Sequence, residues 1–457
     1  MSQSQLPHNQ NTFCVKPFLN SSITSNGMYR VCCECVFGKK TGPEHNFGKL
    51  VKTTGEIYTA SNSTIDETRN APLMKEVRAS MLKGEQHPEC KQCWETEKLG
   101  QYSLRQYMNR FYSKDIIKNC KENTQSDGTI DIAEVPLKYF DIRLGNKCNQ
   151  KCRMCGPGDS SLWLDDWVKM GNTKINFYDD EYAIKKDGNK FSSMIGDWNK
   201  EPFVKQMMEK MHTIDRIYMT GGEPTVIKEY WAILQYAIDN DCAKNINLEY
   251  NSNMFVIPRN AWDIWSKFKS VKMTMSIDGL ENVQDYIRFP SKWPVIEANV
   301  RKFYELTKKH PNISATIAPT ITIYNVMQMP DMIKWYTENN FETFDPVMAL
   351  HICHGPRFLT AQNYPKAHKH KVVDKYNEMF KWANDNLDQG LAEHIITKYQ
   401  GVVDFVLAND IENETTWSGN QTNSHSFIHH TERLDSIRSQ SLATSIPDLA
   451  EAIQDYE

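Results

Sequence analysis

Short apolar runs alternate with longer amphipathic stretches through the middle of the chain. The short runs are rich in Ile, Val, Tyr, Phe and Met, and they predict strands. Stretches such as EYWAILQYAIDND and WPVIEANVRKFYEL repeat apolar residues at helical spacing and predict helices between them. The predicted strands cover residues 139–144, 216–220, 247–250, 272–277, 316–323 and 344–350.

Strands that alternate with helices predict a parallel sheet with right-handed crossovers. Six such units predict an α/β fold, a partial TIM-like (β/α)6 barrel over residues 136–355. The first crossover is long, and residues 171–200 have the character of an insertion in it.

The two flanking regions differ from the barrel in composition and in the pattern of apolar residues. Residues 1–130 predict a small cysteine-rich domain, in which two strand-like runs around Asn26-Gly27 predict a hairpin. Residues 360–457 predict a helical C-terminal region. Within it, residues 412–431 are rich in Asn, Thr, Ser and His, which predicts a loop with solvated histidines.

Charge and hydropathy exclude several classes of partner. The chain has 53 basic and 57 acidic side chains, a net charge of −4, so no global field attracts nucleic acid and we expect no such partner. No run approaches the roughly 18 apolar residues of a membrane span, so we expect no membrane partner. The polar N-terminus lacks the pattern of a secretory signal, which predicts a cytoplasmic protein.

Cysteine usage is the first specific signal. The chain has 12 cysteines in 457 residues, and most of them lie in three tight groups. In a reducing compartment, grouped cysteines hold metal more often than they form disulfides. The groups are therefore candidate metal sites.

A cysteine triplet directly follows the first predicted barrel strand. Cys148, Cys152 and Cys155 are spaced C-x3-C-x2-C. Thiolates normally hold a four-iron cluster in fours, so a loop that supplies three leaves one iron open to a substrate. The loop also lies at the C-terminal end of a strand, where barrel enzymes carry their chemistry. The alternative is a zinc site, for which the triplet needs a distant fourth ligand.

A second motif follows the next strand. Gly221-Gly222-Glu223-Pro224 ends the run IYMT. Two glycines allow close approach of the backbone to a ligand, and a carboxylate suits a cationic group such as an ammonium. Alone this motif is an ordinary turn, but here it stands one strand after the triplet.

The triplet together with the Gly-Gly-Glu-Pro turn resembles the radical S-adenosylmethionine (radical SAM) superfamily. The resemblance covers about half of the chain. It implies a 4Fe-4S cluster that binds S-adenosylmethionine at its open iron, with Cys148, Cys152 and Cys155 as the protein ligands. It further implies cofactor-binding roles for Gly221, Gly222, Glu223, Asn253, Ser276 and Arg288. Within this set the first three would hold the methionyl ammonium, and the last two its ribose and carboxylate.

The N-terminal cysteines carry a second resemblance. The pattern C-x12-G-x4-C with a later C-x2-C is similar to the auxiliary-cluster "twitch" domain, a truncated SPASM domain, although that domain usually follows the barrel. The resemblance implies a second 4Fe-4S cluster held by Cys14, Cys32, Cys90 and Cys93. Cys33 and Cys35 remain alternatives for the second ligand, and a four-cysteine zinc site remains an alternative for the whole.

The resemblance implies a radical SAM enzyme. Such an enzyme cleaves S-adenosylmethionine reductively to a 5′-deoxyadenosyl radical, which takes a hydrogen atom from the substrate. Asp278 and Cys353 are candidate catalytic residues at strand ends. A peptide or protein substrate is favoured over a sugar or another small molecule, and an electron donor such as flavodoxin or ferredoxin is implied. The rival hypothesis is a zinc-stapled binding module without catalysis.

Overall fold

The computed structural model describes residues 12–37, 48–98, 102–177, 180–188, 190–416 and 421–456. Residues 1–11, on which the prediction about an export signal rests, lie outside the described residues. In the described part of the chain, no helix combines the length and the apolarity that crossing a bilayer requires.

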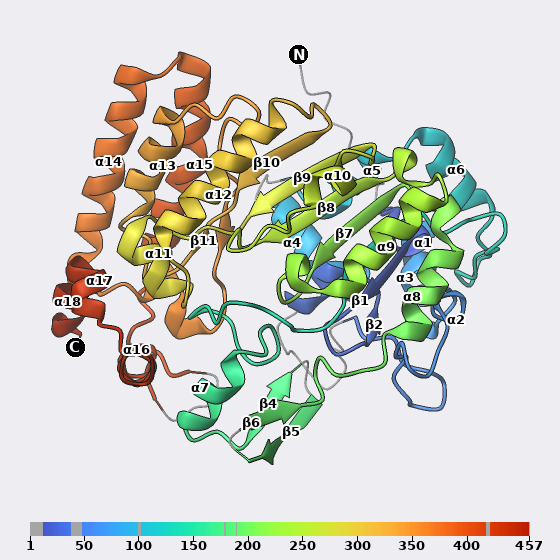
Figure 1. Ribbon diagram of the computed structural model, residues 1–457, viewed down its shortest axis with the longest axis horizontal. Helices are drawn as coiled ribbons and strands as arrows, with labels where there is room; N and C mark the ends of the chain where they lie inside the picture. The colour runs from blue at the N-terminus through green and yellow to red at the C-terminus, as the bar shows by residue number, and fades with distance from the viewer. Residues whose placement is uncertain are drawn as a thin grey trace.

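The core of the molecule is a seven-stranded sheet in the order β10-β9-β8-β7-β3-β1-β2. Its five barrel strands are parallel to their neighbours, as predicted: β3 (Tyr139–Arg143), β7 (Arg216–Thr220), β8 (Asn247–Ser252), β9 (Ser270–Met275) and β10 (Ile313–Ile317). The helices that alternate with them are α8 (Glu201–Glu209), α9 (Lys228–Asp239), α10 (Ala261–Trp265), α11 (Glu281–Ile287), α12 (Trp293–Thr307) and α13 (Met329–Glu338). Figure 1 shows α8, α9, α10 and α12 on the near face of this sheet.

The sixth predicted strand is only partly formed. Regular pairing is limited to β11 (Thr320–Ile321) and β12 (His351–Ile352), which are parallel. Residues 344–350 run beside β10 with hydrogen bonds to Ala315 and Ile317, but they are not a regular strand. Pro346 lies within this run and lacks the N–H that a ladder needs, which accounts for the difference.

The predicted hairpin at Asn26-Gly27 joins the barrel sheet. Strand β1 (Asn20–Ile23) pairs parallel with β3, and β2 (Tyr29–Arg30) pairs antiparallel with β1. The N-terminal helices are α1 (Lys16–Leu19), α2 (Ile65–Arg69), α3 (Pro72–Leu82), α4 (Lys91–Lys98), α5 (Leu104–Phe111) and α6 (Lys114–Glu122). One continuous apolar core runs through the N-terminal region, the barrel and the C-terminal helices. The domain boundaries proposed above stay predictions.

The first crossover carries the predicted insertion. It contains α7 (Trp163–Lys169) and a three-stranded antiparallel sheet of β4 (Lys174–Phe177), β5 (Asp180–Asp187) and β6 (Lys190–Ser193). This sheet has a small core of its own around Leu164, Ile175 and Ile195, and it projects at the bottom of Figure 1.

The C-terminal region is helical, with α14 (Lys369–Asn386) packed against α15 (Gln389–Ala408). The loop predicted for residues 412–431 is wrong in its second half, because α16 (Asn423–Arg438) begins there. Thr422 caps this helix, and Phe427, Thr431, Leu434 and Arg438 form its buried face. Two short helices, α17 (Leu442–Ser445) and α18 (Pro447–Ala452), follow.

The prediction of solvated histidines holds for two of the three. His425 and His429 are exposed. The ring of His430 stacks on Trp163 with 6.2 Å between ring centres, and burial lowers its pKa to about 3. His430 therefore belongs to the packing between α16 and α7.

Candidate functional site: two cysteine centres

The cysteine loop, residues 144–162, leaves the C-terminal end of β3 and is fixed along its length. The backbone N–H groups of Lys151 and Arg153 donate to the carbonyls of Phe289 (2.7 Å) and Ile287 (2.8 Å). The Ser160 hydroxyl donates to the Gln150 carbonyl at 2.5 Å. The loop is thus held both by itself and by the segment that follows α11.

The three predicted cluster thiols of this loop lie together. Cys152 is 5% exposed and shares a hydrogen bond with the Cys155 thiol, while Cys148 interacts electrostatically with Cys152. Burial raises the pKa of Cys148 to about 12. The hydrogen bond from Cys155 lowers the pKa of Cys152, with a further contribution from Arg288.

The Gly221-Gly222 turn packs directly against the cysteine loop. Both glycines have positive φ, 79° and 52°. A Cβ on Gly222 would lie 2.2 Å from the Lys147 carbonyl oxygen, and one on Gly221 would lie 2.6 Å from the Arg143 Cβ. Glycine is therefore required here by both the backbone conformation and the close approach of two loops.

The Glu223 carboxylate is 1% exposed and joins the ends of two strands. One oxygen accepts from the N–H and hydroxyl of Thr225 (3.1 and 2.7 Å) and from the Ser252 hydroxyl (3.0 Å). The other accepts from the Asn253 N–H at 2.7 Å. Burial raises the pKa of Glu223. These contacts give Glu223 a bracing role, and its predicted contact with an ammonium stays a prediction.

Asn253 lies between the Gly-Gly-Glu turn and the cysteine loop. Its side-chain amide nitrogen is 3.9 Å from the Cys148 Sγ and donates to the Asn149 Oδ1 at 2.7 Å. Its side-chain oxygen accepts from the Phe255 N–H at 3.0 Å. The structure thus brings Asn253 to the cysteine loop, and its predicted role in binding the cofactor stays a prediction.

Arg288 connects the cysteine loop to Asp278 at the end of β9. Its Nε donates to the Asp278 Oδ2 at 2.6 Å, and its Nη1 is 3.7 Å from the Cys152 Sγ. Although burial opposes the charge of Arg288, Asp278 and Cys152 raise its pKa above the ordinary value. Asp278 is fully buried, and its second oxygen accepts from the Thr320 N–H at 2.8 Å. Asp278 is therefore an anchor for Arg288.

Ser276 follows β9 of the seven-stranded sheet, and Cys353 follows β12 of the two-stranded sheet. Ser276 is half-buried, and its N–H donates to the Ser252 carbonyl at 2.8 Å. Cys353 follows β12, is 5% exposed and donates to the Gly355 carbonyl at 3.4 Å. Burial raises the pKa of Cys353 to about 11. The predicted roles of both residues stay predictions.

The N-terminal cysteines gather around one small cavity that is partly open to solvent. The cysteines that line it are Cys14, Cys32, Cys35, Cys90 and Cys93. They come from the start of α1, from the turn after β2 and from the start of α4, so the fold assembles them from distant segments. Burial raises the pKa of Cys14 to about 12 and that of Cys93 to about 11.

Cys33 is turned toward Lys16. The Lys16 ammonium is 3.4 Å from the Cys33 Sγ and 3.1 Å from the Asp141 Oδ2, on the inner face of β3. Lys16 and Asp141 are 1% and 0% exposed, so they form a buried ion pair between the N-terminal region and the barrel. Cys32 and Cys35, which line the cavity, are better placed than Cys33 to complete a ligand set.

The inner face of the barrel sheet is polar. Asp141, Tyr218 and Glu249 are paired across β3, β7 and β8 and point to one side of it. The N-terminal elements cover this side, since Lys16 contacts Asp141 and the Met108 sulfur of α5 contacts Arg216. Figure 1 shows α4 and α5 behind the sheet, opposite α9 and α10.

Both cysteine centres suit the clusters that the family resemblance implies. The Cys152 thiol is buried beside Arg288, a cation that complements thiolate charge, and the N-terminal thiols border a pocket. In the described part of the chain, no three His, Cys, Asp or Glu side chains are arranged around a single metal ion. The ligand sets therefore remain predictions.

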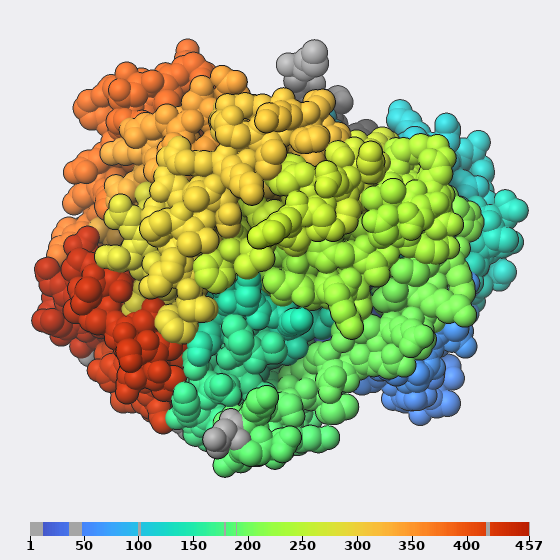
Figure 2. Space-filling view, viewed as in Figure 1, coloured from blue at the N-terminus to red at the C-terminus, as the bar shows by residue number. Residues whose placement is uncertain are grey.

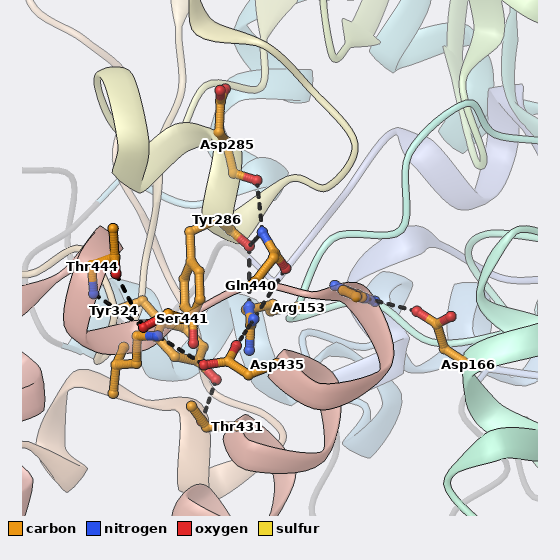
Figure 3. A network of polar contacts seen from close by, with 12 residues as sticks. Arg153, Asp166, Asp285, Tyr286, Tyr324, Thr431, Asp435, Gln440, Ser441 and Thr444 are labelled. Carbon is orange, nitrogen blue, oxygen red and sulfur yellow. Dashed lines mark hydrogen bonds and ion pairs between the residues drawn. The ribbon is translucent and has the colours of Figure 1, made fainter.

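Sequence reasoning missed the residues that hold the loop from the C-terminal side. Figure 3 shows Arg153 of the cysteine loop between Tyr286, Asp435 and Gln440. Arg153 lies between the predicted cluster ligands Cys152 and Cys155. This position was the only signal in the sequence that Arg153 belongs to the site. Its partner Asp435 is 282 positions away in the sequence, and no local pattern reveals such a contact.

The chain is similar to known proteins over part of its length. The model of the radical SAM superfamily matches residues 142–335. No curated protein matches the chain. Among solved structures, anSMEcpe with bound AdoMet is 16% identical, with a TM-score of 0.34, over 55% of this chain and 60% of its own. Streptococcus suis SuiB bound to precursor peptide SuiA is 13% identical, with a TM-score of 0.31, over 69% and 65%. The chain thus covers less than two thirds of either one.

Proposed function

Because residues 142–335 match the model of the radical SAM superfamily, we propose that the protein is a radical SAM enzyme that modifies a peptide or protein side chain. The prediction of an enzyme agrees with this match, because the radical SAM superfamily consists of enzymes. The observation that carries the proposal is the convergence of three thiols, the Gly221-Gly222 turn, Asn253 and Arg288 at the C-terminal ends of β3, β7, β8 and β9.

The residues of this site have distinct tasks in the proposal. Cys148, Cys152 and Cys155 would hold a 4Fe-4S cluster, with Arg288 offsetting the thiolate charge. The Gly221-Gly222 turn and Asn253 would bind the amino-acid part of S-adenosylmethionine. When bound, the cluster and S-adenosylmethionine would supply the radical chemistry that removes a hydrogen atom from the substrate. The chain itself orients the reactants and excludes water.

A second cluster is proposed for the N-terminal cavity. Cys14, Cys32, Cys90 and Cys93 are the proposed ligands, and Cys35 is the alternative for the second. This cavity lies on the side of the sheet that carries Asp141, because Lys16 borders the cavity and pairs with that carboxylate. The cluster would thus stand near the barrel interior, where it accepts an electron from the product or binds the substrate.

Two surfaces support a polar, extended substrate. The inner face of the sheet presents Tyr218 and Glu249, both half-buried. A cleft between the cysteine loop and the inserted sheet holds about 940 Å³ of empty space, and both Phe191 and Lys147 line it. Such mixed walls suit a peptide better than a small polyol. The proposal also requires a one-electron donor such as flavodoxin or ferredoxin.

The metal content of the reconstituted protein tests the proposal. We expect about eight irons and eight sulfides per chain, as for two four-iron clusters, and little zinc. The triple variant C148A/C152A/C155A should keep about half of the iron and lose reductive cleavage of S-adenosylmethionine. The variant C242A, which changes a half-buried cysteine outside both centres, is the matched control.

Two other results would change the assignment. About four irons and one zinc would make the N-terminal centre a structural zinc site. Zinc alone after careful anaerobic reconstitution would overturn the radical enzyme and favour a zinc-stapled binding module. Cofactor cleavage that small polyols stimulate, while peptides do not, would move the substrate to a sugar or another small molecule.

A further inference from the structure

The last turn of α16 reaches the cysteine loop although it lies far outside the matched family region. In Figure 2 the C-terminal residues border the segment that contains the loop and α7. Asp435 and Gln440 contact Arg153 of the loop, while Arg438 contacts Asp166 of α7. Ser439 ends the helix in the left-handed conformation, with φ of 52°, which turns Gln440 back toward the loop.

Arg153 is held by this turn of α16. Its guanidinium is completely buried and lies 3.6 Å from the centre of the Tyr286 ring. Nε donates to the Tyr286 carbonyl at 3.0 Å, while Nη2 donates to the Asp435 carboxylate and, at 3.1 Å, to the Gln440 side-chain oxygen. Because Arg153 follows Cys152 directly, these contacts fix the cysteine loop from outside the barrel (Figure 3).

Arg438 brings a second guanidinium to the same place. Its side chain is fully buried, and Nε donates to the Asp166 carboxylate at 2.7 Å. The same carboxylate accepts from the Lys151 ammonium of the cysteine loop at 2.6 Å. Arg438 and Cys152 are near enough to interact electrostatically.

The guanidinium of Arg438 is incompletely satisfied. Among the described residues, its two terminal nitrogens are buried without a hydrogen-bond partner. Burying such groups without a partner is costly, so the arrangement favours an anion nearby. The network has four cations and three carboxylates: Lys151, Arg153, Arg288 and Arg438 with Asp166, Asp278 and Asp435. Asp159 and Glu223 add negative charge near Cys155 and Cys148, so the unmatched positive charge of the site is that of the Arg438 terminal nitrogens.

We propose that the end of α16 is part of the cluster site, with Asp435 and Arg438 as positioning residues that set the charge around Cys152. The inference rests on the proposed function, because it needs a cluster in the cysteine loop. One-electron reduction adds negative charge to a buried cluster, and a buried cation nearby favours that reduced state. The C-terminal helix would therefore tune how readily the cluster is reduced.

Two substitutions on α16 with opposite signs test the inference. We would measure the midpoint potential of the loop cluster by an anaerobic redox titration followed by electron paramagnetic resonance. The loop signal is the one that disappears in C148A/C152A/C155A. R438Q removes a positive charge and should shift the potential in the negative direction, with about tenfold less reduced cluster at a fixed potential, or about 59 mV for one electron. D435N removes a negative charge and should shift it in the positive direction.

A matched variant isolates the effect of position. R433Q removes the same charge from an exposed position of the same helix and should leave the potential unchanged. Equal shifts in R438Q and R433Q, or shifts of one sign in R438Q and D435N, would overturn the inference. If R438Q does not fold, the midpoint potentials of D435N and R433Q are compared instead. A positive shift in D435N alone supports the inference, because loosened packing gives no reason for a positive shift. Absence of the loop signal in the unmodified chain would instead refute the proposed function.

Discussion

The two cysteine centres of this protein are built in different ways. The loop centre takes its three thiols from eight consecutive residues, Cys148 to Cys155, in a loop that hydrogen bonds fix on both sides. The N-terminal centre takes its thiols from three segments, and Cys14 and Cys93 come together only when the region folds. The first centre is preorganised by its own chain, whereas the second depends on tertiary structure.

The charges around the two centres differ as well. Arg288 and Arg438 act electrostatically on Cys152 of the loop, and Arg288 also lies 3.7 Å from its sulfur. In the N-terminal cavity, Lys16 and Arg105 are both paired with carboxylates, Asp141 and Glu97. Arg288 and Arg438 are paired as well, with Asp278 and Asp166. The difference is that Arg288 lies beside a proposed ligand thiol, Cys152, whereas Lys16 faces Cys33. Thiols of both centres must give up protons as metal binds.

The largest effect should come from removing two ligands of the N-terminal centre. C90A/C93A should lose all iron there and keep about four irons in the loop centre, because the loop is fixed without them. Iron and sulfide analysis after reconstitution, with the spectrum of the remaining cluster, measures this. Loss of the loop iron as well would show that the two centres form one cooperative unit.

The buried ion pair between the two regions should matter next. K16M leaves Asp141 buried and unpaired, which typically costs about 3–5 kcal/mol of unfolding free energy. Anaerobic urea unfolding, followed by circular dichroism, measures the change. K52M removes a lysine from an exposed i,i+4 pair and should have a far smaller effect. Equal effects of the two variants would refute the structural role of Lys16.

The pH dependence of iron loading should separate the two centres more finely. Burial raises the pKa of Cys14 to about 12 and of Cys93 to about 11 in the N-terminal centre, and it raises the pKa of Cys148 to about 12 in the loop centre. The loop centre differs in one thiol, Cys152, whose pKa is lowered by its hydrogen bond with Cys155. A raised thiol pKa means that metal binding must release a proton, so loading improves as pH rises. C148A/C152A/C155A retains the N-terminal centre, and C90A/C93A retains the loop centre. From about pH 7 to about pH 9, iron loading should therefore rise more steeply in the first variant than in the second. Parallel pH profiles would contradict this difference.

The smallest effect should come from Cys33. C33A should keep the full iron content, because this thiol faces Lys16 and does not line the cavity. C32A and C35A are its matched neighbours, and the one that loses iron identifies the second ligand. Iron loss in C33A equal to that in C90A/C93A would place Cys33 in the ligand set.

Most of the barrel and the location of its site could be predicted from local patterns. Strands β3 and β7 are compact apolar runs, and each is followed by the motif that was expected to carry chemistry. The pairing of β1 with β3 could not be predicted, because it joins segments more than a hundred residues apart through backbone hydrogen bonds that leave no side-chain signature.

Helix α16 was missed for a different reason. Its buried face alternates apolar Phe427 and Leu434 with Thr431 and Arg438, so polar residues occupy positions where a periodicity argument expects apolar ones. The same polar positions make the contacts that matter, Thr431 with Tyr324 and Arg438 with Asp166. A hydropathy pattern therefore does not reveal a helix whose buried face is polar.

The Lys16–Asp141 pair also bears on how the chain is made. During synthesis Lys16 leaves the ribosome well before Asp141, which lies 125 positions later. Strand β1 and the N-terminal cysteines must therefore wait for β3 before their pairing is complete. Until then the thiols of the first region are open to oxidation and to capture of stray metal.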